Sequence, residues 1–432
     1  MTRSLTRRQF VAGASALALG PSILSARTGR GKLRLATIGA GGMGGSDLAA
    51  ISSHPDVQVV ALCDVDANTL ANAAKKFPDA KQYRDYRKMF AEIADGIDIV
   101  NVGTPDHTHA PAAMSAMLKG KHVYCQKPLT HDVFESRKLA EFARAKKLVT
   151  QMGIQVHSAS QYRTAVRVIQ DGAIGKVKEV HSWSSKKWGH VGPRPEGEDP
   201  VPANLDWDLW IGTAPMRPFK KRAYHSMEWR RWTDFGCGTM GDMAIHILDP
   251  IAGALQLTQP KTILSESDVP PPESFANKNK VKYVFPGTKF TVDPFPLTWY
   301  DGDAVPTQGW GLDKLPDQGS VFVGEKGNML LPHVAKPQLF PAESFKDYKM
   351  PDVAGENHWH QWVNACKGEG KPSADFDYAG PLTEFVLLGV VANRVPGKLL
   401  TWNAAEMKLE GSPEAAALLK RSYRKGWEVD GL

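Results

Sequence analysis

The chain has few cysteines. Its 432 residues contain only four, Cys63, Cys125, Cys237 and Cys366. They are widely spaced and form no C-x-x-C pair, which argues against a metal site built from thiolates and gives no sign of a disulfide framework. We therefore expect four buried free thiols.

Long hydrophobic runs are also missing beyond the first thirty residues. The twin-arginine pattern of residues 6–10 precedes an apolar stretch, 11–19, that is too short to span a bilayer, and a small-residue region follows it and ends near Ala26. This order predicts a twin-arginine export signal and linker over residues 1–31, and hence a soluble, periplasmic mature protein that passes through the twin-arginine machinery. Leu24 stands where a small residue is expected, so the cleavage point stays open, as does an uncleaved amphipathic N-terminus. No later segment is long and apolar enough to form a membrane helix, so no stable membrane insertion is expected.

No strong excess of charge remains after this segment. The formal net charge is +7, and five arginines before Lys32 account for all the charge of the segment, so removing them leaves about +2. This gives little reason to propose nucleic acid or an anionic membrane as a partner. The twin-arginine route carries folded proteins that often acquire a cofactor in the cytoplasm, which is in keeping with a tightly held cofactor.

Strand and helix signals alternate regularly from residue 32 to residue 150. Such alternation predicts a doubly wound parallel sheet, a Rossmann domain over 32–150. The predicted strands are 33–38, 57–62, 97–102, 122–125 and 148–151, and the helices between them end near 52 or cover 67–77, 86–94, 110–118 and 133–145.

The rest of the chain, 151–432, has a different texture, with frequent proline, glycine and tryptophan. Short alternating runs predict a second α/β domain with a large, mostly antiparallel open sheet, expected to bind substrate and to mediate oligomerisation. Its predicted strands include 177–183, 280–285 and 320–323, and its helices 160–171, 241–253, 359–365 and 381–395, with a long loop over 192–204.

The segment Gly39-Ala40-Gly41-Gly42-Met43-Gly44 follows the first strand and opens a helix. In that position its backbone can approach a pyrophosphate at the helix N-terminus. Asp64 arrives 20 residues after Gly44, at the end of the next strand, where a carboxylate accepts hydrogen bonds from a ribose and repels a 2′-phosphate. NAD is therefore favoured over NADP, and the alternative is a glycine-rich turn in a domain that binds no nucleotide.

The third predicted strand ends in Thr104-Pro105-Asp106-His107-Thr108-His109, a loop expected at the same carboxyl edge of the sheet. His107 and His109 have no evident third partner for a metal, so no metal is expected and contact with cofactor or substrate is favoured. The expected cofactor contacts are Gly39, Gly41, Gly42, Met43, Gly44, Asp64, Thr104, Pro105, His107, His109, Gln126 and Lys127.

Lys127 follows the predicted strand 122–125 and precedes Pro128. A lysine there can reach from the sheet edge toward a cofactor and a substrate hydroxyl, although a solvated loop lysine is the simpler interpretation. Asp242 and His246 are four residues apart, and hence neighbours on one face of a helix. A carboxylate that holds an imidazole is a common way to orient a general base, although such a pair is also common on helix surfaces.

Gly39, Gly41 and Gly44, then Lys127-Pro128, then Asp242 and His246 resemble the motifs of the Gfo/Idh/MocA oxidoreductases, the family of glucose–fructose oxidoreductase and inositol dehydrogenase. The resemblance implies a Rossmann domain and a C-terminal α/β domain whose large open sheet is often buried in an oligomer, so a homo-oligomer is expected. It also implies that Lys127, Asp242 and His246 are the active-site lysine, aspartate and histidine. The family usually has Glu-Lys-Pro, whereas Gln126 stands here, and the lost carboxylate is expected to retune the lysine.

These features predict hydride transfer between NAD(P) and a secondary hydroxyl or keto group of a sugar or glycoside. His246 would accept the hydroxyl proton, Lys127 would donate a hydrogen bond to the same oxygen, and Asp242 would orient His246. The alternatives are a redox-neutral NAD-dependent glycosidase or lyase with tightly bound cofactor, and a ligand sensor without activity. Several tryptophans lie around the long loop, and their aromatic faces can pack against the C–H faces of a sugar. The expected polar or aromatic substrate contacts are Gln155, His157, Lys187, Trp188, Arg230 and His358.

Overall fold

The computed structural model of the chain describes residues 31–432. The predicted twin-arginine signal lies in residues 1–30, outside the described part. Within residues 31–432, no helix combines the length and the apolar character needed to cross a membrane. The four cysteines are buried and unpaired.

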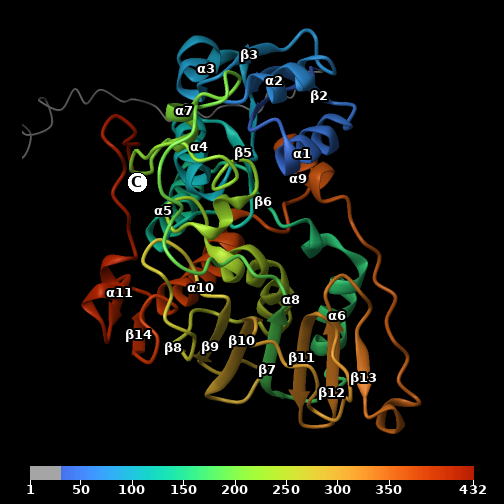
Figure 1. The fold of residues 1–432 in the computed structure, drawn as a ribbon. Helices are drawn as coiled ribbons and strands as arrows, with labels where there is room; N and C mark the ends of the chain where they lie inside the picture. Colours follow the sequence, from blue (N-terminus) through green and yellow to red (C-terminus); the bar gives the residue numbers. More distant parts are fainter. Residues whose placement is uncertain (1–30) are drawn as a thin grey trace, which may run out of the picture. The chain divides into compact units, whose positions relative to one another are not determined.

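The N-terminal half is built on a six-stranded parallel sheet, as the alternating pattern predicted (Figure 1). Successive residues along each strand point to opposite faces, so Leu35 packs with α1 (Gly42–Ser52) and α9 (His358–Cys366) while Ala36 packs with α4 (Asp106–Leu118) and α5 (Val133–Lys146). The strand order is β3-β2-β1-β4-β5-β6, with β1 (Leu33–Ile38), β2 (Val57–Cys63), β3 (Lys81–Tyr83), β4 (Ile99–Val102), β5 (His122–Gln126) and β6 (Thr150–Gly153). The helices are α1 (Gly42–Ser52), α2 (Ala67–Ala74), α3 (Tyr86–Ile93), α4 (Asp106–Leu118) and α5 (Val133–Lys146).

Strand order reverses between β1 and β4, and this switch point is where open α/β sheets bind ligands. The two strands end in glycines that let the chain pack closely there. A Cβ atom on Gly44 would lie 2.3 Å from the carbonyl oxygen of Gly39, and one on Gly103 would lie 2.3 Å from the Cα atom of Gly44. Gly39 itself has φ +85°, which favours glycine. The start of α1 is therefore seated directly on the sheet edge.

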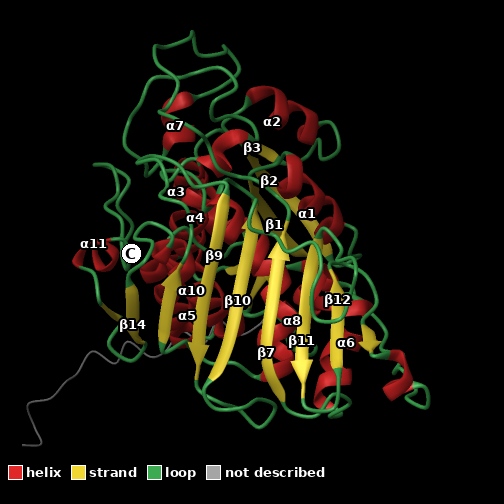
Figure 2. Cartoon of the chain, turned by 60° about the horizontal axis from the view of Figure 1, so that its bottom comes forward, coloured by secondary structure: helices red, strands yellow, loops and turns green. Residues whose placement is uncertain are grey.

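The C-terminal half is built on a nine-stranded, mostly antiparallel sheet, again as predicted, in which only β7 and β10 pair in parallel. Figure 2 shows one broad face of this sheet toward the viewer, with α8 (Ile245–Leu255) and α10 (Phe376–Ala392) behind it. Its order is β13-β12-β11-β7-β10-β9-β8-β14-β15, with β7 (Val177–Ser184), β8 (Thr262–Ser265), β9 (Lys278–Phe285), β10 (Phe295–Gly302), β11 (Gln318–Gly324), β12 (Asn328–Pro332), β13 (Gln338–Phe340), β14 (Leu399–Asn403) and β15 (Lys408–Glu410). The helices are α6 (Ser160–Gln170), α7 (Trp207–Ile211), α8 (Ile245–Leu255), α9 (His358–Cys366), α10 (Phe376–Ala392) and α11 (Pro413–Ala417).

The two halves are more interwoven than a boundary at residue 150 suggests. Strand β6 completes the first sheet and ends at Gly153, and the late helices α9 and α10 return to pack on α1 and α5. Strand β3 was not predicted, because Lys81-Gln82-Tyr83 is an exposed edge without an apolar run. Helix α4 begins at Asp106, so the segment expected to be a loop is partly its first turn.

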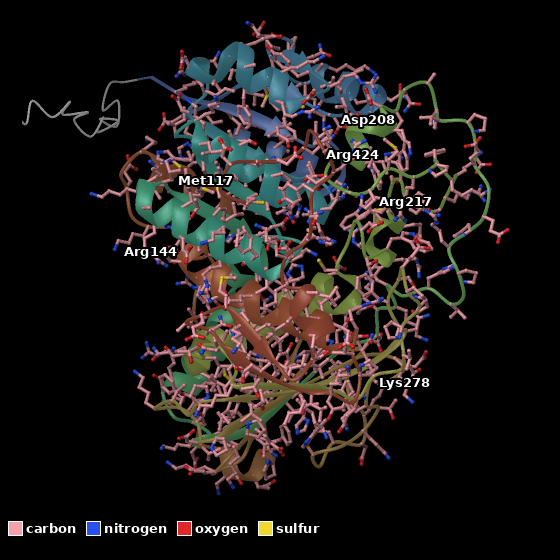
Figure 3. All side chains as sticks on the ribbon, turned by 90° about the vertical axis from the view of Figure 1, so that its left-hand side faces the viewer. Met117, Arg144, Asp208, Arg217, Lys278 and Arg424 are labelled. Atoms are coloured by element: carbon pink, nitrogen blue, oxygen red, sulfur yellow. The ribbon has the colours of Figure 1, made fainter. Side chains whose placement is uncertain are left out.

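A C-terminal strap, residues 418–432, contains no helix or strand and returns toward α4, α5 and α7 (Figure 1). Its residue Arg421 pairs with the buried carboxylate of Glu135 at 2.8 Å, and Tyr423 donates to the same carboxylate at 2.6 Å. Further along, Arg424 pairs with Asp208 at 2.6 Å, and Figure 3 shows these two labelled side chains next to each other. The strap thus attaches the chain end to the Rossmann half.

Replacing Arg421 by Met should destabilise the protein by about 3 kcal/mol, because Glu135 would be left as an unpaired buried charge. Chemical denaturation measures the change. Arg167→Met is the matched control, since Arg167 pairs with Asp171 on an exposed helix face and should cost less than about 1 kcal/mol. Equal losses for the two variants would contradict the assigned role of the strap.

Candidate active site

The side chains of Lys127 and Asp242 meet between the two halves of the chain. Lys127 follows β5 at the carboxyl edge of the parallel sheet, and Asp242 lies in a π-helical turn, Met240–Ala244, that leads into α8. The Lys127 Nζ atom donates to Asp242 Oδ1 at 2.7 Å and to the backbone oxygen of Asp242 at 3.1 Å. Each side chain is only 13% exposed, so little water screens the two charges from each other.

Two more side chains hold the Asp242 carboxylate. Arg230 Nε lies 3.3 Å from Oδ1, and Trp188 Nε1 donates to Oδ2 at 3.0 Å. The Arg230 guanidinium also lies 4.2 Å from the ring centre of Trp229. Burial alone would raise the pKa of Asp242, but the positive charges of Lys127 and Arg230 lower it well below its ordinary range. Asp242 is therefore an anion at neutral pH.

His246 does not bind Asp242, although their spacing led us to expect it. Within residues 31–432, Asp242 accepts its side-chain hydrogen bonds from Lys127, Arg230 and Trp188, and the buried Nδ1 atom of His246 has no partner. The expectation assumed an ordinary α-helix, whereas the π-helical turn at Asp242 redirects its side chain. Asp242 faces the lysine instead of orienting the histidine.

His246 is nevertheless suited to accept a proton. It lies in the first turn of α8 and is almost fully buried. Burial lowers its pKa well below the ordinary value, the charge of Lys127 lowers it further, and Asp242 opposes the shift. The imidazole is therefore neutral at neutral pH, which is the form that a general base needs.

The glycine-rich segment and Asp64 lie together at the switch point. The two Asp64 carboxylate oxygens accept hydrogen bonds from the backbone N–H groups of Ala40 and Asp66, both at 2.9 Å. Burial raises the pKa of Asp64. Gly42 has φ +50° and open space around it, and Met43 is exposed. This edge can receive a ligand.

His107 and His109 are buried among protein atoms. His107 Nε2 lies 3.0 Å from the backbone oxygen of Trp210, and the two ring nitrogens of His109 lie 2.7 Å and 2.8 Å from the backbone oxygens of Pro128 and Thr104. Burial lowers the pKa of His107 to about 3 and that of His109 to about 4. Direct contact with a ligand was expected, but the structure makes His109 a link between the Thr104-Pro105 turn and the Lys127-Pro128 segment.

Gln126 connects Lys127 to a buried carboxylate that the sequence analysis missed. Gln126 Nε2 donates to Asp47 Oδ2 at 2.8 Å, and the backbone N–H of Lys127 donates to Gln126 Oε1 at 3.2 Å. Trp359 Nε1 donates to Asp47 Oδ1 at 2.9 Å. Burial raises the pKa of Asp47 to about 6. A carboxylate thus stands one hydrogen bond away from position 126, where the related proteins were expected to have glutamate.

Only some of the residues expected to contact the substrate lie at the Lys127–Asp242 pair. Trp188 and Arg230 reach the Asp242 carboxylate, whereas Lys187 forms an exposed ion pair with Asp303 at 2.6 Å. His358 is buried, with its nitrogens 2.9 Å from the backbone oxygen of Met152 and 2.8 Å from Ser158 Oγ, so neither nitrogen is free for a ligand.

Gln155 and His157 lie in the short turn after β6. His157 Nδ1 pairs with Asp249 on α8 at 2.9 Å. Burial would lower the pKa of His157, but the Asp249 carboxylate raises it on balance. The buried Oε1 atom of Gln155 has no partner within residues 31–432. Two of the six expected residues therefore meet the Lys127–Asp242 pair directly.

Comparison with known proteins identifies the family. Residues 33–154 match the family model of oxidoreductases with an NAD-binding Rossmann fold, and residues 158–290 match the C-terminal α/β domain of the same family. The chain belongs to the Gfo/Idh/MocA family. Together the two matches cover more than half of the chain.

Curated relatives and solved structures agree with this assignment. The chain is 24% identical to levoglucosan dehydrogenase of Pseudarthrobacter phenanthrenivorans over 226 residues, half of each protein, and 29% identical to inositol 2-dehydrogenase of Gluconacetobacter diazotrophicus over 187 residues, 41% of this chain and 54% of the relative. It thus spans about half the length of these relatives.

Solved structures of low identity share the fold. One is a WlbA dehydrogenase from Chromobactrium violaceum, in complex with NADH and UDP-GlcNAcA. It has a TM-score of 0.62 at 16% identity, and the match covers 86% of this chain and 96% of the WlbA chain. An inositol dehydrogenase homologue from Azotobacter vinelandii, complexed with NADH and myo-inositol, has a TM-score of 0.58 at 17% identity and covers 87% and 99%.

The residues at the switch point fit the NAD that this Gfo/Idh/MocA protein is built to bind. The glycine-rich segment leaves space for a pyrophosphate, and the Asp64 oxygens keep lone pairs for a ribose. The buried Thr104 Oγ1 atom has no partner within residues 31–432, which is an orphan polar group that a ligand at this edge can satisfy.

Asp106 is a second residue of the site that the sequence did not single out. It begins α4 and is 3% exposed. Burial raises its pKa to about 7, although the charges of Arg230 and Lys127 lower it. A residue beside Pro105 gave no local signal of this burial. Its protonation state contributes to the net charge around Lys127, together with Asp242 and Arg230.

Replacing Gln126 by Glu should place a second carboxylate against Asp47 and cost about 2 kcal/mol of stability at pH 7. The repulsion raises the folded-state pKa of the new carboxyl above its unfolded value. The folded chain then binds more protons, so the loss grows as the pH rises from about 4. Thermal unfolding at several pH values measures it.

The double variant Gln126→Glu, Asp47→Asn should recover most of the lost stability, because one carboxylate again faces one amide. Gln82→Glu on the exposed edge strand is the control and should change stability by less than about 0.5 kcal/mol. A double variant as unstable as Gln126→Glu would show that the two side chains do not interact as described.

Proposed function

We propose that the protein is an NAD-dependent oxidoreductase that interconverts a secondary hydroxyl and a keto group on a sugar or glycoside by hydride transfer. The observation that carries this proposal is the Lys127–Asp242 ion pair at the cofactor edge, with the neutral His246 in the same site. NAD is favoured over NADP, because Asp64 would repel a 2′-phosphate.

The chain's own residues divide the work. His246 accepts the proton of the substrate hydroxyl, and Lys127 donates a hydrogen bond to the same oxygen as negative charge develops there. Asp242 holds the Lys127 ammonium in place, and Arg230 and Trp188 hold Asp242. Bound NAD would supply the hydride acceptor. A positioned base of this kind contributes on the order of 100- to 10,000-fold to the rate.

Polyhydroxylated rings are the favoured substrate class. The relatives named above are dehydrogenases of levoglucosan and inositol, and Trp188 offers an aromatic face at the site. Most other tryptophans around the long loop fill the core: Trp207, Trp210, Trp229 and Trp232 are buried in one aromatic cluster, and Trp183 is fully buried in another.

The setting of the enzyme is also part of the proposal. The twin-arginine pattern of residues 6–10 supports export to the periplasm, and the broad sheet face free of helices in Figure 2 is compatible with a homo-oligomer. Export, in turn, favours a cofactor that stays bound.

Replacing His246 by Ala should reduce turnover of a polyol such as myo-inositol by at least about 100-fold while NAD affinity stays unchanged, because the base is lost but the Rossmann edge is intact. NADH formation and NAD titration measure the two quantities. His360→Ala, far along the chain in α9 and paired with Ser53, is the control. Normal turnover by His246→Ala would contradict the assignment of His246 as the general base.

A redox-neutral glycosidase or lyase is the weaker alternative. It is favoured by a 31% identity over 153 residues to a glycosyl hydrolase family 109 protein of Saccharopolyspora erythraea, covering 34% of this chain and 33% of the relative. The protein purified with its bound cofactor and given glycosides without added NAD should accumulate reduced cofactor or keto-sugar in stoichiometric amount. Steady release of aglycone would instead support the alternative.

A further inference from the structure

His333 has no role in the mechanism above, yet it lies beside His246. It follows β12, in the turn toward β13, and its ring centre is 5.9 Å from that of His246, with the two rings tilted by 47°. The side chain is only partly buried. A residue from the edge of the nine-stranded sheet therefore reaches the histidine proposed as the base.

Tyr162 of α6 fixes the orientation of this ring. Its hydroxyl lies 2.6 Å from His333 Nδ1. Burial raises the pKa of Tyr162 well above its ordinary value, so the phenol keeps its proton and can donate a hydrogen bond to Nδ1. With the phenol as donor, neutral His333 carries its own proton on Nε2.

The turn that carries His333 is strained. Val334 has φ +55°, a conformation that β-branched residues rarely adopt. The backbone N–H of His333 donates to Gln318 at 2.9 Å, and that of Ala335 to Pro332 at 3.2 Å, which holds the turn in place. Strain of this kind is kept where a side chain must be aimed.

The surroundings keep His333 uncharged. Burial lowers its pKa, and so does the positive charge of Lys127. The charged and titratable groups around the Tyr162–His333 pair are Lys127, His246 and, on the side of Tyr162, Asp249. Within residues 31–432 no protein group engages Nε2, so its N–H is available to a ligand.

We propose that His333, with its tautomer fixed by Tyr162, binds the hydroxyl next to the one that His246 deprotonates, and so selects substrates with two adjacent hydroxyls. The reacting oxygen already has His246 and Lys127 as partners. The ring centres of His246 and His333 lie 5.9 Å apart, which is close enough for one substrate to contact both imidazoles through oxygens on adjacent carbons. The inference rests on the proposed function, and it names the substrate class as a vicinal diol.

The test compares myo-inositol with its deoxy analogue that lacks one hydroxyl next to the oxidised carbon. His333→Ala should raise KM for myo-inositol by about 10-fold and leave kcat within about 3-fold, because one neutral hydrogen bond to the substrate is lost. Its kcat/KM for the deoxy analogue should stay near that of the wild type. The wild-type preference for the diol then collapses, and His333→Gln, which keeps an N–H donor, should restore part of it.

Tyr162→Phe should give an intermediate loss of preference, because the histidine keeps its place but not its fixed tautomer. Lys336→Ala, an exposed residue of the same turn, is the control, and NAD affinity and the melting temperature report on folding. An unchanged diol preference in His333→Ala would overturn the inference. Absence of turnover by the wild-type protein with every sugar and polyol would instead overturn the proposed function.

Discussion

The ion pair between Lys127 and Asp242 is the interaction on which the rest of the site depends. It joins the carboxyl edge of the parallel sheet to the start of α8, and the partial burial of both side chains leaves their attraction little screened by water. Each half of the chain supports its own member of the pair. On the Rossmann side, Gln126 and His109 fix the segment around Lys127, and on the other side Arg230 and Trp188 fix the carboxylate.

The electrostatics of the site follow from this pair. The Lys127 charge, together with burial, keeps His246 and His333 neutral, so one imidazole is ready to accept a proton and the other to donate a hydrogen bond. Asp242 limits the lysine's field, and Asp106, with a pKa raised by burial to about 7, adds a carboxyl whose charge varies near neutral pH. At neutral pH Asp242 is therefore charged, His246 and His333 are neutral, and Asp106 titrates between the two forms.

Much of the fold was predictable, because local sequence patterns indicate the strands of both sheets. The apolar runs of β1, β2, β4 and β5 and the glycine-rich turn between β1 and α1 gave the Rossmann half, and alternating runs gave the strands of the second sheet. Contacts between residues that are far apart in the sequence were harder to predict. The spacing of Asp242 and His246 suggested a pair, but the partner of Asp242 is 115 positions away in sequence, and Asp47, Tyr162 and His333 carry no local motif. His107 and His109 read as ligand contacts because their burial depends on segments far along the chain, such as that of Trp210.

A double-mutant cycle on Lys127 and Asp242 measures whether the two side chains act as one unit in hydride transfer. The rate of NADH formation in a single turnover at saturating NAD should fall strongly in Lys127→Met and in Asp242→Asn. Because the two groups act as one unit, the double variant should be scarcely slower than Lys127→Met alone, giving a coupling energy of at least about 2 kcal/mol. A double variant slowed by the product of the two single fold-changes, which means that the two activation free energies simply add, would contradict this coupling.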